Sequence, residues 1–195
     1  MRQVTGMKLV QVQVWKMPVS AGIQGRMTIC PSQWRRFAGI SAGVFPLPDP
    51  MRAALEAARR AAGSGEVPVG AVVVQAGRII AAAANAPRAL CDPTAHAEIL
   101  AIRAAAAHLG QDRLEGCDLW VTLEPCAMCA GAIAHARINR LYYGAADAKG
   151  GAVEHGPRFF AQETCHHMPE IYSGIGEAEA AALLRSFFAQ RRSSV

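Results

Sequence analysis

The sequence predicts a layered α/β domain, because segments with the apolar pattern of buried strands alternate with segments that have a helical period. A second observation is that two short polar motifs lie where predicted strands give way to predicted helices. Binding sites of α/β sheets commonly lie at such places. The strands are expected over residues 67–74, 78–84, 118–123 and 138–144. The helices are expected over residues 49–62, 95–109, 126–136 and 177–192.

Each element has a local reason in the sequence. In the first helix, Met51 and Leu55 recur at helical spacing on one side. The run 67–74 is apolar and β-branched almost throughout, as in a strand buried on both faces, and the turn at 75–77 leads into the next strand. In the last helix, packing on the core is the simplest explanation of the pair Phe187-Phe188.

The first quarter of the chain differs in composition from the rest. Residues 1–48 contain six Lys or Arg and no acidic residue, whereas residues 49–195 contain 14 basic and 15 acidic residues. The sequence pI of 9.1 therefore reflects the first quarter and does not predict a nucleic-acid surface on the folded part. We interpret 1–48 as a basic extension outside the fold and 49–195 as one domain. An organelle transit peptide, or a start at Met27 or Met51, also fits the extension.

The two polar motifs predict a catalytic zinc site. His96 in the first motif, with Cys126 and Cys129 in the second, supplies three ligands and leaves a fourth position open to water. Such a zinc ion lowers the pKa of its water to roughly 7. Glu98, two residues after His96, is then the candidate for proton transfer as a carboxylate outside the ligand set.

The local structure of the motifs is also predictable. Cys126 and Cys129 are three residues apart and share a helix face, and Pro125 suits the first turn of that helix. His96 and Glu98 do not share a helix face, so we expect an irregular first turn that Asp92 or Thr94 caps. A structural zinc knuckle, or no metal, is the alternative. A closed structural site needs a fourth ligand, and the remaining cysteines are isolated in the sequence.

The residues resemble one family, the bacterial tRNA-specific adenosine deaminases. The combined His-x-Glu and Pro-Cys-x-x-Cys signature is known for zinc nucleobase deaminases in general. Runs around it resemble the tRNA branch, and the resemblance covers about Asp49 to Arg192, whereas residues 1–48 have no counterpart in it. The matching runs are 67–72, 92–98, 121–126, 128–132 and 143–149.

The resemblance implies a cytidine-deaminase-like, three-layer α/β/α sandwich around a five-stranded mixed sheet. It implies one Zn²⁺ per protomer on His96, Cys126 and Cys129, a homodimer, and the anticodon stem-loop of a tRNA as partner. It further implies base recognition by Asn85 and contacts with the substrate from Asp147, Lys149 and Phe188. Without the resemblance, Asn85 is equally well explained as a turn residue after a strand.

Three functions remain open from the sequence. The first is deamination of adenosine to inosine at the wobble position of a tRNA, the second is deamination of free guanine or cytosine or of a nucleotide, and the third is a silent zinc or RNA-binding module. Glu98 disfavours the third, because a closed structural site has no use for an unligated acid. Cys165-His166-His167 suggests a second metal site, but a loop histidine pair is more often solvated. No apolar run reaches the ~18 residues of a membrane span, and isolated cysteines favour a cytoplasmic location.

Overall fold

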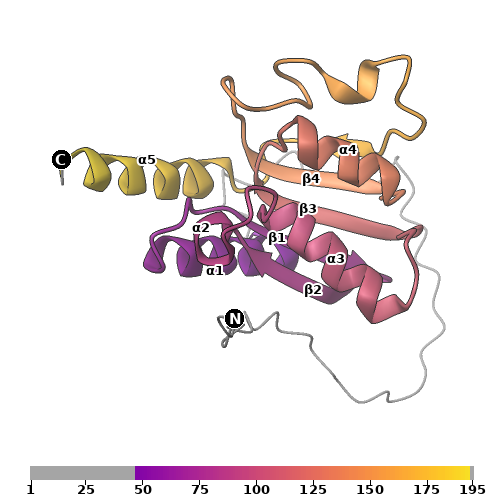
Figure 1. The fold of residues 1–195 in the computed structure, drawn as a ribbon, viewed down its shortest axis with the longest axis horizontal. Coiled ribbons are helices and arrows are strands. Elements are labelled where there is room, and N and C mark those ends of the chain that lie inside the picture. Colours follow the sequence, from indigo (N-terminus) through magenta and orange to yellow (C-terminus); the bar gives the residue numbers. More distant parts are fainter. Residues whose placement is uncertain (1–46, 194–195) are drawn as a thin grey trace, which may run out of the picture. The chain divides into compact units, whose positions relative to one another are not determined.

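We describe a computed structural model of the protein, in which residues 47–193 can be placed. The predicted extension, residues 1–48, lies almost entirely outside the described residues. Five strands form one mixed sheet in the order β2-β1-β3-β4-β5, in which β1 runs antiparallel to β2 and β3, while β3, β4 and β5 are parallel (Figure 1). The strands are β1 (Gly70–Gln75), β2 (Arg78–Ala84), β3 (Cys117–Leu123), β4 (Arg140–Ala145) and β5 (Glu170–Tyr172).

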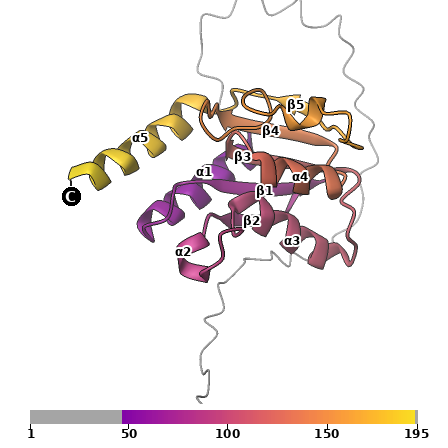
Figure 2. The ribbon, with the colours of Figure 1, turned by 45° about the horizontal axis from the view of Figure 1, so that its top comes forward.

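Helices cover both faces of the sheet, which confirms the predicted α/β/α fold. The helices are α1 (Asp49–Gly63), α2 (Pro87–Leu90), α3 (Ala97–Leu109), α4 (Ala127–His135) and α5 (Glu177–Ser193). Figure 1 shows α3 and α4 side by side, and Figure 2 shows the same pair from a second direction. None of the described helices is long and apolar enough to cross a membrane.

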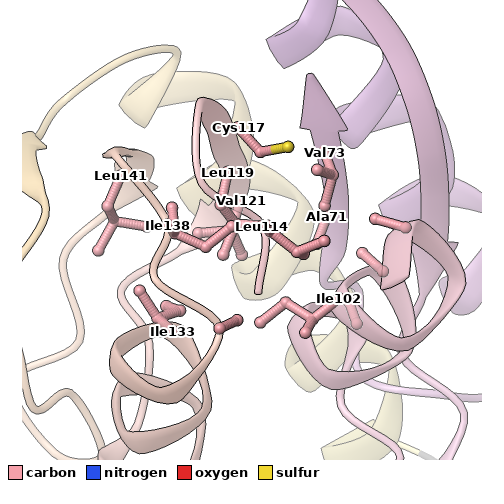
Figure 3. Packing of buried hydrophobic residues seen from close by; sticks show 14 of the residues in the cluster. Ala71, Val73, Ile102, Leu114, Cys117, Leu119, Val121, Ile133, Ile138 and Leu141 are labelled. Atoms are coloured by element: carbon pink, nitrogen blue, oxygen red, sulfur yellow. The ribbon is translucent and has the colours of Figure 1, made fainter. Parts of the chain in front are cut away.

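Two hydrophobic clusters lie on the two faces of the sheet, because alternate residues of a strand point to opposite sides. Ala71 and Val73 of β1 pack with residues of α3 and α4, including Ile102 and Ile133 (Figure 3). The intervening Val72 and Val74 pack with residues of α1 and α5. The strand is therefore buried on both faces, as its apolar sequence predicts.

Several predicted boundaries were wrong by a few residues. The strand predicted over 67–74 begins only at Gly70, because Pro68 has no N–H and the N–H of Val69 donates to the carbonyl of Val67 at 2.8 Å. Gly70 is required at the start of β1, since a Cβ there would lie 2.1 Å from the carbonyl oxygen of Ala54 in α1. The strand predicted over 138–144 is β4, displaced toward its C-terminal end.

The sequence patterns did not predict β5 or α2, which have three and four residues. The five-stranded sheet was expected from the family resemblance alone. β5 completes a row of stacked rings across the parallel half of the sheet. The ring of Tyr142 lies between those of Trp120 and Tyr172, with centroid distances of 3.9 and 4.7 Å.

Candidate metal centre

The candidate metal ligands sit at the starts of two helices on the same side of the sheet. His96 is the N-cap residue of α3 and Cys126 is the N-cap residue of α4, both with extended backbone and without a side-chain capping bond. The prediction that Asp92 or Thr94 caps α3 was therefore wrong. Asp92 instead accepts hydrogen bonds from the N–H and hydroxyl of Thr94, at 2.8 and 2.7 Å, and so shapes the loop before His96. Pro125 precedes the N-cap and lies outside the first turn of α4.

The three ligand atoms lie at distances that suit a tetrahedral zinc ion. Nδ1 of His96 is 3.7 Å from Sγ of Cys126 and 3.5 Å from Sγ of Cys129, and all the ligand atoms lie within 4.8 Å of one another. Ligand bonds of about 2.0 Å to nitrogen and 2.3 Å to sulfur at tetrahedral angles place such atoms about 3.6 Å apart. Among residues 47–193, this is the only group of three His, Cys, Asp or Glu side chains that close together.

The environment of the two thiols favours one thiolate at neutral pH. The hydrogen bond from Cys129, together with the contact with His96, lowers the pKa of Cys126 to about 4. The same bond, together with burial, raises the pKa of Cys129 well above its usual value. A divalent cation removes the second proton as well, because a coordinating thiol is deprotonated.

Glu98 occupies the second position of α3 and is buried beside this group. The residue is only 4% exposed, and its Oε2 atom has no hydrogen-bond partner among the described residues. Burial raises the pKa of Glu98. A buried carboxyl with an unpaired oxygen is costly, so its presence next to a nitrogen and two sulfur ligands points to proton transfer rather than to stability.

A cavity of about 260 Å³ opens beside these groups, between the end of β2 and the starts of α3 and α4. Of the residues that sequence reasoning proposed, it is lined by His96, Glu98, Cys126, Asn85 and Asp147. Its size suits one nucleobase better than a large ligand, because pockets for drug-sized molecules begin near 300 Å³.

Some of the proposed substrate contacts line the cavity beside the candidate metal ligands, and others do not. Asn85 is 8% exposed, and its amide makes no hydrogen bond to other described residues, so both its donors and its acceptor are available to a ligand. Lys149 and Phe188 do not line the cavity among the described residues. Phe188 is 44% exposed on α5, while its neighbour Phe187 is buried, so packing on the core explains only one ring of the pair.

Sequence reasoning missed Glu124, which lies between the end of β3 and Pro125. Burial alone would raise the pKa of this carboxyl, but hydrogen bonds from the backbone of Asp147, His155 and Glu154 and from the His155 side chain lower it to about 2. Its position inside the second polar motif was visible in the sequence, but its partners lie 23 to 31 residues later.

The suggested second metal site does not form among the described residues. The thiol of Cys165 donates to the carbonyl of His167 at 3.2 Å, and Nε2 of His167 lies 2.6 Å from the carbonyl oxygen of Ile138. The Cys165 bond stays within the loop that follows the 3-10 turn Phe159–Ala161, and the His167 contact joins this loop to the segment just before β4.

Comparison with known proteins identifies the family. Residues 48–145 match the model of the cytidine and deoxycytidylate deaminase zinc-binding region. A tRNA-specific adenosine deaminase of Agrobacterium fabrum is 61% identical over 142 residues, which cover 73% of this chain and 93% of that protein. The chain belongs to the tRNA-specific adenosine deaminases.

Solved structures agree with this family. A structure from a study of A-to-I editing by tRNA:A34 deaminases at the wobble position of transfer RNA has a TM-score of 0.69 and 61% identity, covering 69% of this chain and 98% of that one. A mutant of the protein NE0047, in complex with 8-azaguanine, has a TM-score of 0.62 and 30% identity, covering 72% and 83%. The tRNA-specific adenosine deaminases thus share this sheet with a protein that binds a free purine analogue.

Proposed function

We propose that the protein is a zinc-dependent hydrolase that converts adenosine to inosine at the wobble position of a tRNA. The observation that carries the proposal is the unpaired, buried oxygen of Glu98 beside the His96, Cys126 and Cys129 group, at a cavity of nucleobase size. The relative that is 61% identical bears this substrate in its name. A catalytically silent module gives no reason for the unpaired acid.

In this proposal, His96, Cys126 and Cys129 hold one zinc ion per chain, as the fit of their distances supports. When bound, zinc supplies Lewis-acid activation of water near neutral pH. Glu98 takes one proton from the attacking water and passes it to a ring nitrogen of the purine, and it then moves the second proton from the new hydroxyl to the departing amine. A C–O bond forms at C6 of adenine, the bond from C6 to the exocyclic nitrogen breaks, and one water is consumed for each ammonia released.

The substrate contacts also belong to the proposal. The Asn85 amide can donate to and accept from the edge of a purine, and Asp147 lies at the same cavity. Lys149 and Phe188, farther out, would meet the RNA around the flipped base. An anticodon-loop base is inexpensive to extrude because it is already largely unpaired. The location of this reaction, with its tRNA substrate, would be cytoplasmic.

We also propose a homodimer that uses the outer face of α3 and α4. A second cavity of about 550 Å³ lies there, with Ile99, Ile102, Ala132 and Phe159 among its lining residues. Arg103, Arg113 and Arg137 also line this hollow, so an interface there would combine apolar contacts with contacts to charged side chains. Light scattering of the purified full chain should give twice the mass of one chain, and a monomer at micromolar concentration would refute this part of the proposal.

The function is tested by comparing two substrates. The full chain and a variant that begins at Asp49 are each given an anticodon stem-loop with adenosine at the wobble position, and free guanine. We expect both proteins to form inosine in the stem-loop with kcat/KM far above that for guanine, since flanking bases contribute binding energy that positions the target.

Guanine is the appropriate competitor because the NE0047 mutant binds 8-azaguanine. A preference for guanine would refute RNA editing and favour a purine-base deaminase. The variant tests the extension separately. If the six basic residues of 1–48 contact RNA, the full chain should bind more tightly than the variant at low salt, and this difference should disappear as salt is raised.

A further inference from the structure

The buried carboxylate of Glu124 binds the loop of residues 147–155 to the segment between β3 and α4, just before Cys126. The side chain of Glu124 has no exposed surface. Its Oε1 atom accepts hydrogen bonds from the backbone N–H groups of Val153, Glu154 and His155, at 3.1, 2.9 and 3.0 Å. Its Oε2 atom accepts from the N–H of Asp147 at 3.0 Å and lies 2.7 Å from Nδ1 of His155.

The contact between Glu124 and the ring of His155 has a defined direction. Both carboxylate oxygens already receive N–H donors, so the carboxylate is an acceptor throughout and Nδ1 of His155 must carry the hydrogen. Hydrogen bonds to an ionised acceptor are about twice as strong as those between neutral groups. His155 thus adds the one side-chain bond to a set of four backbone bonds.

The loop of residues 147–155 is built to accept this carboxylate. A Cβ on Gly151 would lie 2.5 Å from the carboxyl carbon of Glu124 and 2.5 Å from the carbonyl oxygen of Asp147, so only glycine fits. Asp147 Oδ1 in turn accepts from the N–H groups of Lys149 and Gly150, each at 3.0 Å. The loop is therefore bonded within itself, and a shift at its anchor displaces Asp147 and Lys149 together.

The anchor also joins this loop directly to the metal centre. Ala152 donates its N–H to the carbonyl of Pro125 at 2.9 Å, and Pro125 is followed by Cys126. Asp147 and Gly150 line the cavity together with Cys126. Glu124 lies at the same cavity, but all its bonds go to the loop, so it has no free oxygen with which to move a proton.

We propose that Glu124 and His155 are positioning residues that hold the loop 147–155, and with it Asp147 and Lys149, in place for the substrate. This inference rests on the proposed function, because the loop is useful in this way only if it contacts the RNA. Neither residue touches the reacting atoms. Their loss should weaken substrate binding and leave the chemical step and the metal in place.

The test replaces the ring of His155 in two ways. His155→Ala removes the donor, whereas His155→Asn retains an N–H at nearly the place of Nδ1. The full-length zinc proteins are compared by hydrogen exchange of the peptide that contains 147–155 and by kcat and KM on the anticodon stem-loop. His108→Ala is the matched control, because His108 is exposed on α3 and its side chain makes no hydrogen bond or ion pair with other described residues.

We expect His155→Ala to exchange faster in this loop and to raise KM about tenfold, the size expected for one lost bond to a charged group. Its kcat should stay within about twofold and its zinc content unchanged, while His155→Asn restores both exchange and KM. Wild-type exchange and KM in the Ala variant would overturn the proposal. So would failure of Asn to rescue, or a loss of kcat at constant KM, which would indicate a part in the chemistry.

The two proposals can fail separately. An inactive wild-type enzyme on the stem-loop would refute the proposed function alone. Hydrogen exchange of the free protein needs no substrate, and it would still decide whether His155 and Glu124 hold the loop. A Glu124→Gln variant gives a second readout, because the amide nitrogen cannot accept from the N–H of Asp147. The control is Glu115→Gln, at an exposed position in the turn before β3. Equal exchange of wild type, Glu124→Gln and this control would overturn the anchor.

Discussion

Two buried glutamates near the candidate ligands, Glu98 and Glu124, have opposite surroundings. Glu98 has an oxygen with no hydrogen-bond partner among the described residues, and burial raises its pKa. Glu124 receives four backbone N–H groups and one side-chain donor, which outweigh the effect of burial and lower its pKa to about 2. The same side chain at similar burial therefore has a raised pKa at one place and a lowered pKa at the other.

The difference shows how a carboxyl is assigned to chemistry or to structure. A group for proton transfer must have a free oxygen and a pKa that can be reached at working pH. A group that holds a loop must have every oxygen occupied. Glu98 has the free oxygen and a raised pKa, and Glu124 has both oxygens occupied, although both lie within two residues of a proposed ligand. The predictions below test whether the two roles can be separated.

The largest effect is expected from removing one of the three candidate zinc ligands. Cys129→Ala should abolish zinc binding and deamination, because two ligands do not retain zinc tightly. Elemental analysis and an inosine assay measure both. Cys91→Ala, which removes an exposed thiol, should retain about one zinc per chain and full activity. Zinc at the wild-type level in Cys129→Ala would contradict the ligand assignment.

Replacing Glu98, the glutamate with an unpaired oxygen, should slow the reaction and leave zinc binding unchanged. Glu98→Gln keeps the shape but cannot move a proton, so kcat should fall by about 10²- to 10⁴-fold or more. Zinc content and thermal stability should remain near wild type, since Oε2 of Glu98 makes no bond that holds the fold. Single-turnover rates close to wild type would show that another group moves the proton, and loss of zinc would make Glu98 a ligand.

Adding a methyl group next to Glu124 should reduce the stability of the fold more than the rate of the reaction. Gly151→Ala places a methyl group 2.5 Å from the carboxyl carbon of Glu124, so we expect a loss of about 1–3 kcal/mol in the free energy of unfolding. Urea unfolding measures it. Gly63→Ala is the matched control, because no atom lies within 4 Å of the added methyl and its φ is negative. Equal unfolding midpoints for the two variants would mean that the loop 147–155 accommodates the added methyl group without a loss of stability.

The smallest effect is the dependence of the Glu124 contribution on pH. Its pKa is lowered from the usual 4.5 to about 2, so its charged form stabilises the fold above pH 4.5 and this stability is lost as the pH falls toward 2. The difference in unfolding free energy between wild type and Glu124→Gln should therefore be constant from pH 7 to 5 and should shrink between pH 4.5 and 3. Zinc content, measured at each pH, must fall equally in both proteins. A constant difference down to pH 3 would contradict the low pKa.

Local sequence patterns predicted the parts of the fold that local physics determines. Periodicity located α1 and α5, alanine content located α3, the Cys126–Cys129 spacing located α4, and the turn at 75–77 located the hairpin of β1 and β2 to within three residues. The three residues that metal-ligand spacing singled out, His96, Cys126 and Cys129, lie close together in the structure. The family resemblance added the fifth strand, and it also singled out Asn85 and Asp147. In the structure, both residues line the same cavity as Glu98.

The rest could not be predicted because it depends on contacts between distant segments. β5 has three residues and is defined by its pairing with β4, so no pattern within it is long enough to detect. The cap of α3 was assigned to Asp92 or Thr94 on residue type. In the structure, the N–H and hydroxyl of Thr94 donate to the carboxylate of Asp92, and the N-cap position falls on His96. The bonds of Glu124 require a loop 23 to 31 residues away.

The stacked rings of Trp120, Tyr142 and Tyr172 give the parallel half of the sheet an optical signature. Their planes deviate by only 7° and 11° at contact distance, so their aromatic electronic transitions couple and should produce a near-ultraviolet circular dichroism band. One ring comes from each of β3, β4 and β5, so separation of the edge strand removes the contribution of Tyr172 and leaves the Trp120–Tyr142 pair stacked. Detachment of β5 can therefore be followed spectroscopically in the unlabelled protein, independently of the zinc site and of any substrate.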